Sequence, residues 1–252
     1  MTVNSDTNEN QRCFEILNNI TVSCVIFGYD NNHLKVLVYR NDIPFEGNIY
    51  LEWKLPGSHV RRCERICDTA DRKLKEQTGQ ENIYVKQFMV FSDPDRLKHP
   101  LRDYEWAKLR LKDVRVISVG FYSLINISDV VNSSILEDVK WMNVYEIKEL
   151  MFDNKKIIDE ALKKLRFDLL LEPLVFELLP EKFTLTQMQN IYEAIFNTTY
   201  DKRNYRRKVG KMPYLIPLNE TETGVSHKPA RLYHYDRDIY EKTRTEFFSF
   251  RV

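Results

Sequence analysis

The stretch Glu52–Gln80, EWKLPGSHVRRCERICDTADRKLKEQTGQ, determines how the first two thirds of this 252-residue chain are interpreted. It begins with a Trp-x-Leu-Pro-Gly segment, in which proline and glycine favour a turn. Apolar side chains then recur at every fourth position, at Ile66, Ala70 and Leu74, as on one face of an α-helix. Gly79 follows where such a helix would end, because glycine readily adopts the left-handed conformation that terminates helices. The stretch therefore predicts a glycine turn followed by a short amphipathic helix.

Six residues in and around this helix have a spacing of their own: Gly57, Glu64, Arg72, Leu74, Glu76 and Gly79. In this spacing the stretch resembles the Nudix box, a glycine loop and a short helix whose clustered glutamates hold magnesium against a diphosphate. The resemblance implies an α+β domain of Nudix fold, an α/β/α sandwich, over roughly residues 12–165.

The metal-binding positions of that box are altered in this chain. A working box places glutamates at relative positions i, i+3 and i+4, on one helix face, where they share a hard cation. Here those positions hold Lys73, Glu76 and Gln77, so a cation replaces one ligand and a neutral amide another. We therefore expect a degenerate box with no metal ion, no cofactor and no hydrolysis. The alternative is that glutamates elsewhere, such as Glu64 or Glu105, rebuild the site.

Apolar, β-branched and aromatic residues predict strands on both sides of the box. The expected strands are Ile20–Tyr29, Leu34–Tyr39, Ile49–Leu55, Ile83–Phe91, Val114–Ile125 and Val139–Val144. Residues Val144–Phe152 predict a short helix, and Ile157–Leu171 a longer charged one. The polar and aromatic insertion Asp93–Lys112 exceeds the usual loop length, which predicts a functional lid or a small helix of its own.

The composition, 43% hydrophobic and 30% charged residues, is typical of a globular protein with a core. No apolar run approaches the ~18 residues of a membrane-spanning helix. The polar N-terminus lacks the apolar region of a secretory signal, and residues 1–12 are expected to be a disordered arm. The four cysteines contain no Cys-x-x-Cys pair, and Cys24 lies in an apolar strand pattern. We therefore expect a reduced, cytoplasmic protein.

The net charge of +1 is distributed unevenly along the chain. From Lys182 onward there are 13 Lys and Arg residues against 8 Asp and Glu, a balance of +5, whereas the preceding residues have a balance of −4. Such an asymmetry favours a C-terminal part that meets a polyanion.

Two helices and a hairpin are expected in this basic part. Apolar residues with helical spacing follow Thr184 and Thr186, either of which can cap a helix. Asp201 caps a second helix, Lys202–Met212, with inward apolar residues at i, i+4 and i+7. Two short helices joined by a tight turn, the second strongly basic, match a helix-turn-helix. The strand patterns Tyr214–Leu218 and Arg231–Tyr235 then predict the wing of a winged helix.

The second helix carries six basic residues and no acidic one. Arginine and asparagine read guanine and adenine edges, while lysine more often neutralises phosphate. The alternative is a basic face that is merely solvated, and for the wing turn a solvated turn. We predict contacts to double-stranded DNA from Thr186, Gln187, Lys202, Arg203, Asn204, Arg206, Arg207, Lys208, Lys211, His227 and Lys228.

A second resemblance covers the C-terminal third. The run LEPLVFELLPEKFTLTQMQNIYEAIFNTTYDKRNYRRKV, with the preceding MFDNKKIIDEALKKLR, resembles the junction and DNA-binding region of the Nudix-related transcriptional regulators. That family joins a sensor of Nudix fold to a C-terminal winged helix, and the arabinose-responsive sugar regulators are the expected nearest group. The resemblance implies a homodimer on a palindromic operator, an effector-sensing domain at 13–165 and a DNA-binding domain at 166–252.

The chain departs from the Nudix box pattern at one further place, Ser58, and from the regulator family's pattern at three places. Ser58 replaces the usual second glycine of the box, and Ser23 stands where the first strand often has an acidic residue. The Phe-Asp-His of the junction is Phe-Asp-Asn at 152–154, and the insertion Asp93–Lys112 lies where the family is short. These departures leave the identity of the effector open.

We interpret the chain as a transcriptional regulator that senses a small effector, a sugar such as L-arabinose, and controls carbohydrate-utilisation genes. The expected effector contacts are Arg40, Glu52, Lys54 and Asp93, with Trp53 either stacking on a sugar or lying in the core. A surface or structural role is the alternative for each. Two other functions stay open: a Nudix hydrolase of ADP-ribose or other nucleoside diphosphate derivatives, and an ADP-ribose-responsive regulator of NAD metabolism.

Overall fold

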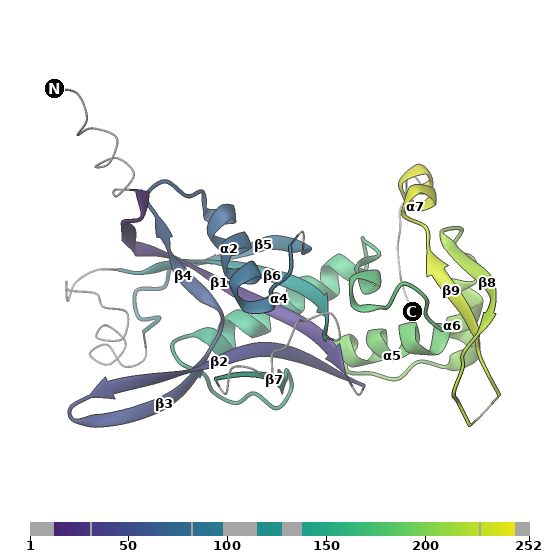
Figure 1. Ribbon diagram of the computed structural model, residues 1–252, viewed down its shortest axis with the longest axis horizontal. Helices are drawn as coiled ribbons and strands as arrows, with labels where there is room; N and C mark the ends of the chain where they lie inside the picture. The colour runs from purple at the N-terminus through teal and green to yellow at the C-terminus, as the bar shows by residue number, and fades with distance from the viewer. Residues whose placement is uncertain are drawn as a thin grey trace. The chain divides into compact units, whose positions relative to one another are not determined.

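The computed structural model describes residues 13–30, 32–81, 83–97, 115–127, 138–226 and 228–244, and Figure 1 labels its helices and strands. The expected arm at 1–12 and most of the insertion Asp93–Lys112 lie outside the described residues. The chain forms two compact units. The first contains residues 1–28 and 35–161, and the second contains residues 29–34 and 162–252.

The first unit is built on one sheet. Its strands are β1 (Ile16–Asp30), β2 (His33–Phe45), β3 (Asn48–Lys54), β4 (Gly57–Arg61), β5 (Val85–Phe91), β6 (Ile117–Asn126) and β7 (Val139–Asn143). They are arranged in the order β3-β2-β1-β6-β5, while β4 pairs with β1 and β7 pairs with β2. The edge strand β3 and the adjoining part of β2 form a long hairpin that extends from the sheet (Figure 1).

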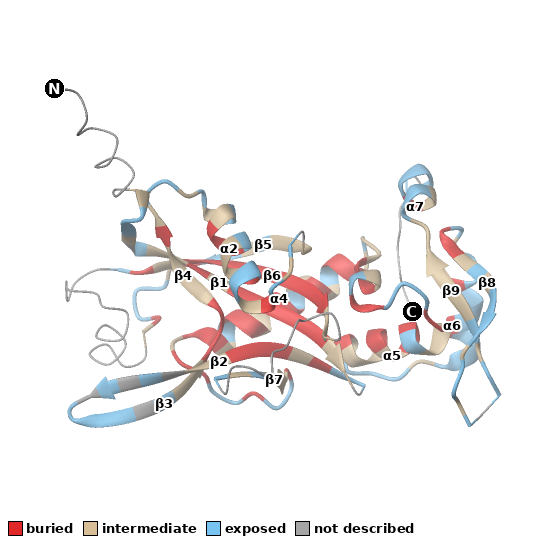
Figure 2. Cartoon of the chain, in the orientation of Figure 1, coloured by how far each residue is buried: buried red, intermediate tan, exposed pale blue. Residues whose placement is uncertain are grey.

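Alternate side chains bury both faces of this sheet, as expected for a layer between helices. On one face Val22, Ile26 and Phe121 pack with Ala70 and Leu74 of helix α2 (Ile66–Thr78). The opposite face is also buried, with the side chains of Val25, Phe27, Val36, Val38, Tyr122 and Leu124. Figure 2 shows this buried core along the central strands, with exposed residues towards the β2–β3 hairpin.

Strand β4 and helix α2 have clear causes. A Cβ on Gly57 would lie 2.5 Å from the carbonyl oxygen of Val22, so the pairing of β4 with β1 requires glycine at this position. Helix α2 begins where the backbone N–H of Arg65 donates to the carboxylate of Asp68 at 3.1 Å. It ends at Gly79, which is left-handed at φ 71°. The expected helix and its C-terminal stop are confirmed, whereas Gly57 lies in strand β4 rather than in a turn.

The second unit contains α4 from Leu162 onward (α4 spans Asn154–Leu169), the 3-10 helix η3 (Leu174–Leu178), α5 (Leu185–Phe196), α6 (Lys202–Val209), β8 (Leu215–Thr221), β9 (Arg231–Tyr235) and α7 (Arg237–Thr243). Aromatic rings form much of its core. Phe176 stacks on Tyr235 with ring centroids 4.0 Å apart, and Tyr214 meets Phe176 edge-on at 6.3 Å. Phe183 bonds to Tyr233 in both directions, at 3.0 and 2.8 Å, and so ties η3 and α5 to the hairpin.

This unit also contains the turn of the first hairpin, residues 29–34. The hydroxyl of Tyr29 donates to Asn32 at 2.9 Å, and the amide of Asn190 on α5 donates to the same Asn32 oxygen at 3.1 Å. Leu34 is fully buried. Strands β1 and β2 thus continue from the first unit into the second.

Two local expectations are wrong. The segment 144–152 is not a helix but a series of turns, because Asn143 binds the backbone N–H groups of Tyr145 and Glu146, and the N–H of Met151 pairs with the carbonyl of Trp53. Residues 57–61, expected to continue the glycine turn, form strand β4 on β1. Among the described helices, none has the length and apolar character needed to cross a bilayer.

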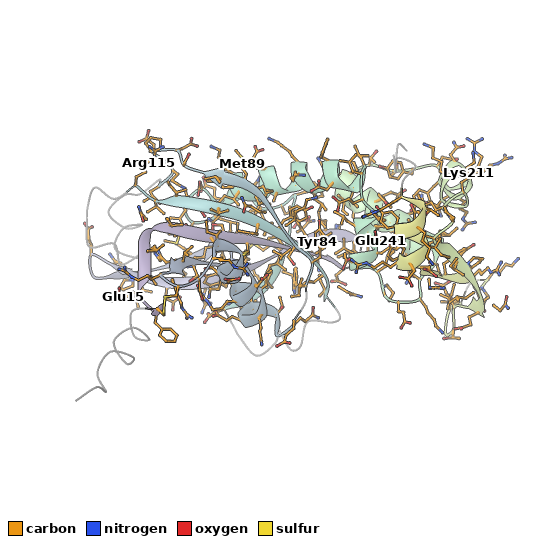
Figure 3. All side chains as sticks on the ribbon, turned by 90° about the horizontal axis from the view of Figure 1, so that it is seen from above. Glu15, Tyr84, Met89, Arg115, Lys211 and Glu241 are labelled. Atoms are coloured by element: carbon orange, nitrogen blue, oxygen red, sulfur yellow. A yellow bond between two sulfur atoms is a disulfide. The ribbon has the colours of Figure 1, made fainter. Side chains whose placement is uncertain are left out.

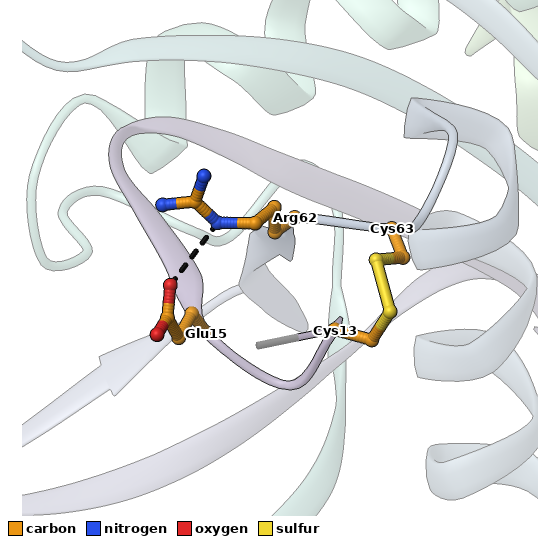
Figure 4. Close-up of a disulfide and its surroundings, with 4 residues drawn as sticks. All are labelled: Cys13, Glu15, Arg62 and Cys63. Carbon is orange, nitrogen blue, oxygen red and sulfur yellow. Dashed lines mark hydrogen bonds and ion pairs between the residues drawn. A yellow bond between two sulfur atoms is a disulfide. The ribbon is translucent and has the colours of Figure 1, made fainter. Parts of the chain in front are cut away.

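The expectation of reduced cysteines is also wrong at one pair. Cys13 and Cys63 form a disulfide that joins the start of the described chain to the loop before α2 (Figure 4). An ion pair between Glu15 and Arg62, 3.0 Å from carboxylate to guanidinium, lies beside it. Cys24 is buried and free, and Cys67 is exposed and free.

Candidate effector cavity and nucleic-acid interface

Helix α6 is fixed at both ends and along its inner face. The carboxylate of Asp201 accepts from the N–H of Asn204 at 2.8 Å, as expected for its cap. Tyr205 and Val209 are buried, and Tyr205 packs against Tyr192 of α5 with ring centroids 6.3 Å apart. The helix ends at Val209, because Gly210 follows, rather than continuing to Met212.

The turn between α5 and α6 is held by side chains of α5. Asn197 is left-handed at φ 51° and ends α5. The amide of Gln189 donates to the carbonyl of Tyr200 at 2.9 Å, and the carboxylate of Glu193 accepts from the N–H of Tyr200 at 2.8 Å. Because these bonds fix the angle between the helices, the outer face of α6 is presented as a rigid surface.

That outer face is basic and exposed. The exposed polar residues of α6 and its C-terminal end are Lys202, Arg203, Asn204, Arg206, Arg207, Lys208 and Lys211. Arg207 bonds to the side-chain oxygen of Asn204 at 3.2 Å, and Lys211 extends away from the ribbon (Figure 3). Asp201 caps the helix, and no carboxylate occurs within it.

The predicted DNA contacts outside α6 differ in how far they are exposed. Thr186 is half-buried, and Gln187 is exposed but exchanges hydrogen bonds with Thr184 in the capping box of α5, at 2.7 and 3.2 Å. Lys228 is exposed between β8 and β9, whereas His227 lies outside the described residues. The wing also carries Glu220, which pairs with Lys182 at 2.7 Å.

In the first unit, the altered Nudix helix has its surviving carboxylates paired with cations. Arg72 holds Glu64 through two bonds of 2.7 and 2.9 Å and reaches Glu76 at 3.2 Å, while the ammonium of Lys73 lies 2.7 Å from Glu76. Hydrogen bonds from Arg72 lower the pKa of Glu64 to about 2. Burial alone would raise the pKa of Glu76, but the bond from Lys73 holds it below its usual value. Two carboxylates and two cations leave no surplus negative charge for a divalent cation.

Within the described residues, no three His, Cys, Asp or Glu side chains come together in a way that could hold a metal ion. Glu105, one of the two glutamates considered for a rebuilt site, lies outside those residues. Glu64, the other, is committed to Arg72.

A cavity of about 90 Å³ lies where β1, β4 and the end of β3 meet. Its lining residues are Thr21, Val22, Ser23, Lys54, Leu55, Gly57, Ser58, His59, Arg96, Leu97, Val116, Phe152 and Asn154. A buried ion pair closes one side, since Arg96 binds Asp153 through two bonds of 3.1 and 2.8 Å. Asn154 is fixed by accepting the N–H of Leu55 at 2.8 Å.

Of the four predicted effector contacts, Lys54 lines this cavity and is only 5% exposed. Its ammonium lies 4.6 Å from the ring centroid of Tyr39. Arg40 pairs with Asp138 at 2.8 Å, and Asp93 pairs with Lys156. These two, and Glu52 on the β2–β3 hairpin, are not among the cavity's lining residues in the described chain. Trp53 is half-buried and carries the ammonium of Lys140 over its ring at 4.3 Å.

The departures from the family pattern, by contrast, surround the cavity. Ser23, Ser58 and Asn154 all line it. Of the two junction residues that match the family, Phe152 also lines the cavity and Asp153 anchors its Arg96. Phe152 has a left-handed backbone at φ 57°, which costs an ordinary residue energy and is more frequent at functional sites. The departures from the family pattern could therefore have indicated the cavity from the sequence. Arg96 lies inside the expected insertion, and nothing in the sequence marked it as a cavity residue.

Comparison with known proteins agrees with both units. A profile of the NrtR DNA-binding winged helix domain matches residues 175–235. The chain is 25% identical over 230 residues to the "ADPR responsive transcriptional repressor NtrR" of Acinetobacter baylyi, across 88% of this chain and 84% of the relative. NrtR of Shewanella oneidensis, solved with a 27mer DNA, superimposes with a TM-score of 0.70 at 25% identity, over 88% of this chain and 95% of that one.

The chain is NrtR-like in both of its domains. Its fold is a Nudix-like domain followed by a C-terminal winged helix, as predicted. A MutT/nudix family protein from Enterococcus faecalis shares the fold, with a TM-score of 0.62 and 22% identity over 86% of this chain and 88% of that one. The expected similarity to the arabinose-responsive sugar regulators is not supported, because the matches are to NrtR and to an ADPR-responsive repressor.

Proposed function

We propose that this NrtR-like chain is a transcriptional regulator whose α6 enters the major groove of DNA. The observation that carries the proposal is a rigidly capped helix with an exposed, uniformly basic outer face, within a segment that matches the NrtR DNA-binding winged helix domain. Similarity to an NrtR solved with DNA supports the same reading. A helix with these side chains combines base-reading arginine and asparagine with phosphate-binding lysine.

The proposed effector is ADP-ribose or a related nucleoside diphosphate, rather than L-arabinose. Similarity to an ADPR-responsive repressor supports this choice. The lining of the cavity also supports it, since Lys54, Arg96 and His59 are its ionisable residues in the described chain and none of them is acidic.

The Nudix-like domain, in this proposal, binds its effector without hydrolysing it. Hydrolysis of a diphosphate in a Nudix site requires a divalent cation that activates water and clamps the phosphates. Here Arg72 and Lys73 already occupy the carboxylates of Glu64 and Glu76.

We further propose that the regulator binds a palindromic operator as a homodimer. The edge strand β3 supports this, because Ile49 and Leu51 expose 71% and 59% of their surface on an outermost strand. Light scattering should then report twice the chain mass. Leu51→Asp should reduce that mass, while Val90→Asp on the opposite edge strand β5 should not. An unchanged mass in both variants would remove β3 from the interface.

Titration calorimetry and DNA gel shifts on the full chain test the function. ADP-ribose is expected to bind and to change the mobility shift of duplexes selected from a random-sequence library, while L-arabinose does neither. The opposite ligand preference would restore the sugar interpretation. Hydrolysis of ADP-ribose with Mg²⁺ or Mn²⁺ that disappears in Glu76→Gln would establish an enzyme instead.

A further inference from the structure

The disulfide between Cys13 and Cys63 lies at the surface of the first unit, beside the altered Nudix box (Figure 4). Cys63 is exposed and Cys13 is half-buried. A disulfide that solvent can reach is open to attack by small thiols, whereas a buried structural one resists them. Cys63 also lies in the loop between strand β4 and helix α2, next to Glu64 of the box. Opening this disulfide therefore affects the segment that joins β4 to the box.

Apart from the disulfide, the start of β1 is tied to β4 and the following loop by surface contacts. The pairing of β1 with β4 is interrupted between Ile16 and Thr21, so Ile16 and Arg61 pair apart from the rest of the ladder. The backbone N–H of Arg62 donates to the carbonyl of Glu15 at 2.7 Å, and the side chains of these two residues form an ion pair that is 59% and 53% exposed. Exposed ion pairs add little stability. The disulfide is therefore the strong link at this end of the sheet.

Strand β4 connects this link to the cavity. Gly57, Ser58 and His59 of β4 line the cavity, and Nδ1 of His59 is hydrogen-bonded to the carbonyl oxygen of Leu17 at 3.3 Å. Leu17 lies in the interrupted part of the ladder. An open disulfide lets the start of β1 separate from β4, because chain ends held by few buried contacts open locally at low cost. His59 then loses the bond to Leu17, and the β4 wall of the cavity loses order.

We propose that the Cys13–Cys63 disulfide is a redox switch of effector binding: when closed it holds β4 in the cavity wall, and when open it weakens the binding of ADP-ribose. This inference rests on the proposed sensing of ADP-ribose and adds a control by thiols. A small thiolate attacks Sγ of Cys63, the S–S bond breaks, and Cys13 leaves as a thiolate that takes up a proton. A second small thiol then displaces the first from Cys63. Two small thiols are thereby oxidised to their own disulfide while both cysteines are reduced.

The other two cysteines allow the state of the switch to be measured. Cys67 is exposed and free, and Cys24 is buried and free. Burial raises the pKa of the Cys24 thiol to about 12, which keeps it protonated and slow to react. In a Cys67→Ser chain, alkylation of the folded protein therefore counts the thiols released from Cys13 and Cys63.

The full-length Cys67→Ser chain, compared in its oxidised form and after treatment with millimolar glutathione, tests the proposal. Glutathione should open the disulfide without unfolding the chain, as followed by mass spectrometry after alkylation and by circular dichroism. Hydrogen exchange of the amides of residues 57–62 should then become faster. Titration calorimetry should show ADP-ribose binding at least about 5-fold weaker, the low end of typical couplings between two sites. Cys13→Ser combined with Cys67→Ser should behave like the reduced chain with or without glutathione.

The outcomes separate the switch from the proposed function. A disulfide that stays closed in glutathione overturns the switch, and so does an open disulfide with unchanged exchange at 57–62 or unchanged affinity for ADP-ribose. A reduced chain that unfolds altogether shows a structural disulfide and also overturns it. If neither form binds ADP-ribose, the proposed effector is refuted; faster exchange at 57–62 on reduction then still supports the switch, and unchanged exchange refutes it as well. The comparison of oxidised and reduced chain needs no substitution at Cys13, so it decides the matter even if Cys13→Ser does not fold.

Discussion

The packing of α6 fixes the direction in which the side chain of Arg207 points, and this direction leads to a specific prediction about DNA binding. Buried Tyr205 and Val209 define the inward direction. With 3.6 residues per turn, Arg207 points about 180° away from it, and Arg206 only about 80° away. With α6 in the major groove, as proposed above, Arg207 would meet base edges, whereas Arg206 would lie beside a phosphate backbone.

Changing Arg207 or Arg206 to alanine should affect DNA binding in different ways. Loss of a bidentate contact between arginine and guanine costs about 1–3 kcal/mol, so Arg207→Ala should weaken specific binding about 5- to 150-fold and leave non-specific binding almost unchanged. Arg206→Ala should weaken specific and non-specific binding alike and reduce the slope of log K against log salt by about 0.9. Lys182→Ala is the control, since Lys182 is exposed in the same unit but pairs with Glu220.

Fluorescence anisotropy on a selected duplex and on a scrambled one, each over a series of salt concentrations, measures all of these quantities. If Arg207→Ala and Arg206→Ala both retain the specificity ratio and the salt slope of the natural chain, α6 is not the recognition helix. If the two variants are indistinguishable from each other, the orientation deduced from Tyr205 and Val209 is wrong.

Three further predictions concern the first unit. The double variant Lys73→Glu, Gln77→Glu restores glutamates at the metal-binding positions of the box, and it should bind Mg²⁺ detectably by calorimetry. If no heat of binding is measured, these carboxylates are not sufficient for Mg²⁺ binding. The pKa of Glu64 is lowered from 4.5 to about 2, so its ionised carboxylate stabilises the folded state above pH 4.5, and this stabilisation is lost as the pH falls towards 2. The free energy of unfolding of Glu64→Gln, measured in urea, should therefore depend less on pH in this range than that of the natural chain. The same pH dependence in both proteins would contradict this. Cys13→Ser opens a disulfide with a separation of 50 residues and should lower the free energy of unfolding by up to about 4 kcal/mol, while Cys67→Ser should not.

Elements governed by local signals could be predicted from the sequence. Thr184 and Asp201 mark helix starts by side chains that bond within the next turn, and both caps are present. The period of apolar residues fixed the inner faces of α5 and α6, and Arg231–Tyr235 matches β9. In each case the residues that carry the signal are within a few positions of the structure they specify.

Features that depend on distant partners were missed. Strand β4 exists because Gly57 can approach the backbone of Val22, which no nearby residue indicates. Cys13 and Cys63 are 50 residues apart, and their pairing depends on the route of β1. The cavity collects residues from β1, β3, β4 and later segments, so only Lys54 was identified as a contact, from its place beside the glycine turn.

The turn of the first hairpin, residues 29–34, has a practical consequence for dividing this protein. Because these residues belong to the second unit, a fragment that begins at residue 162 would lack Asn32, the partner of Asn190, and the buried Leu34. A fragment that ends at 161 would in turn contain Asn32 without its partner Asn190, and the buried Leu34 without the rest of the second unit. Neither half is then a complete folding unit, and a single proteolytic cut between 161 and 162 should leave the two pieces associated. Studies of DNA binding by this chain are therefore best done at full length.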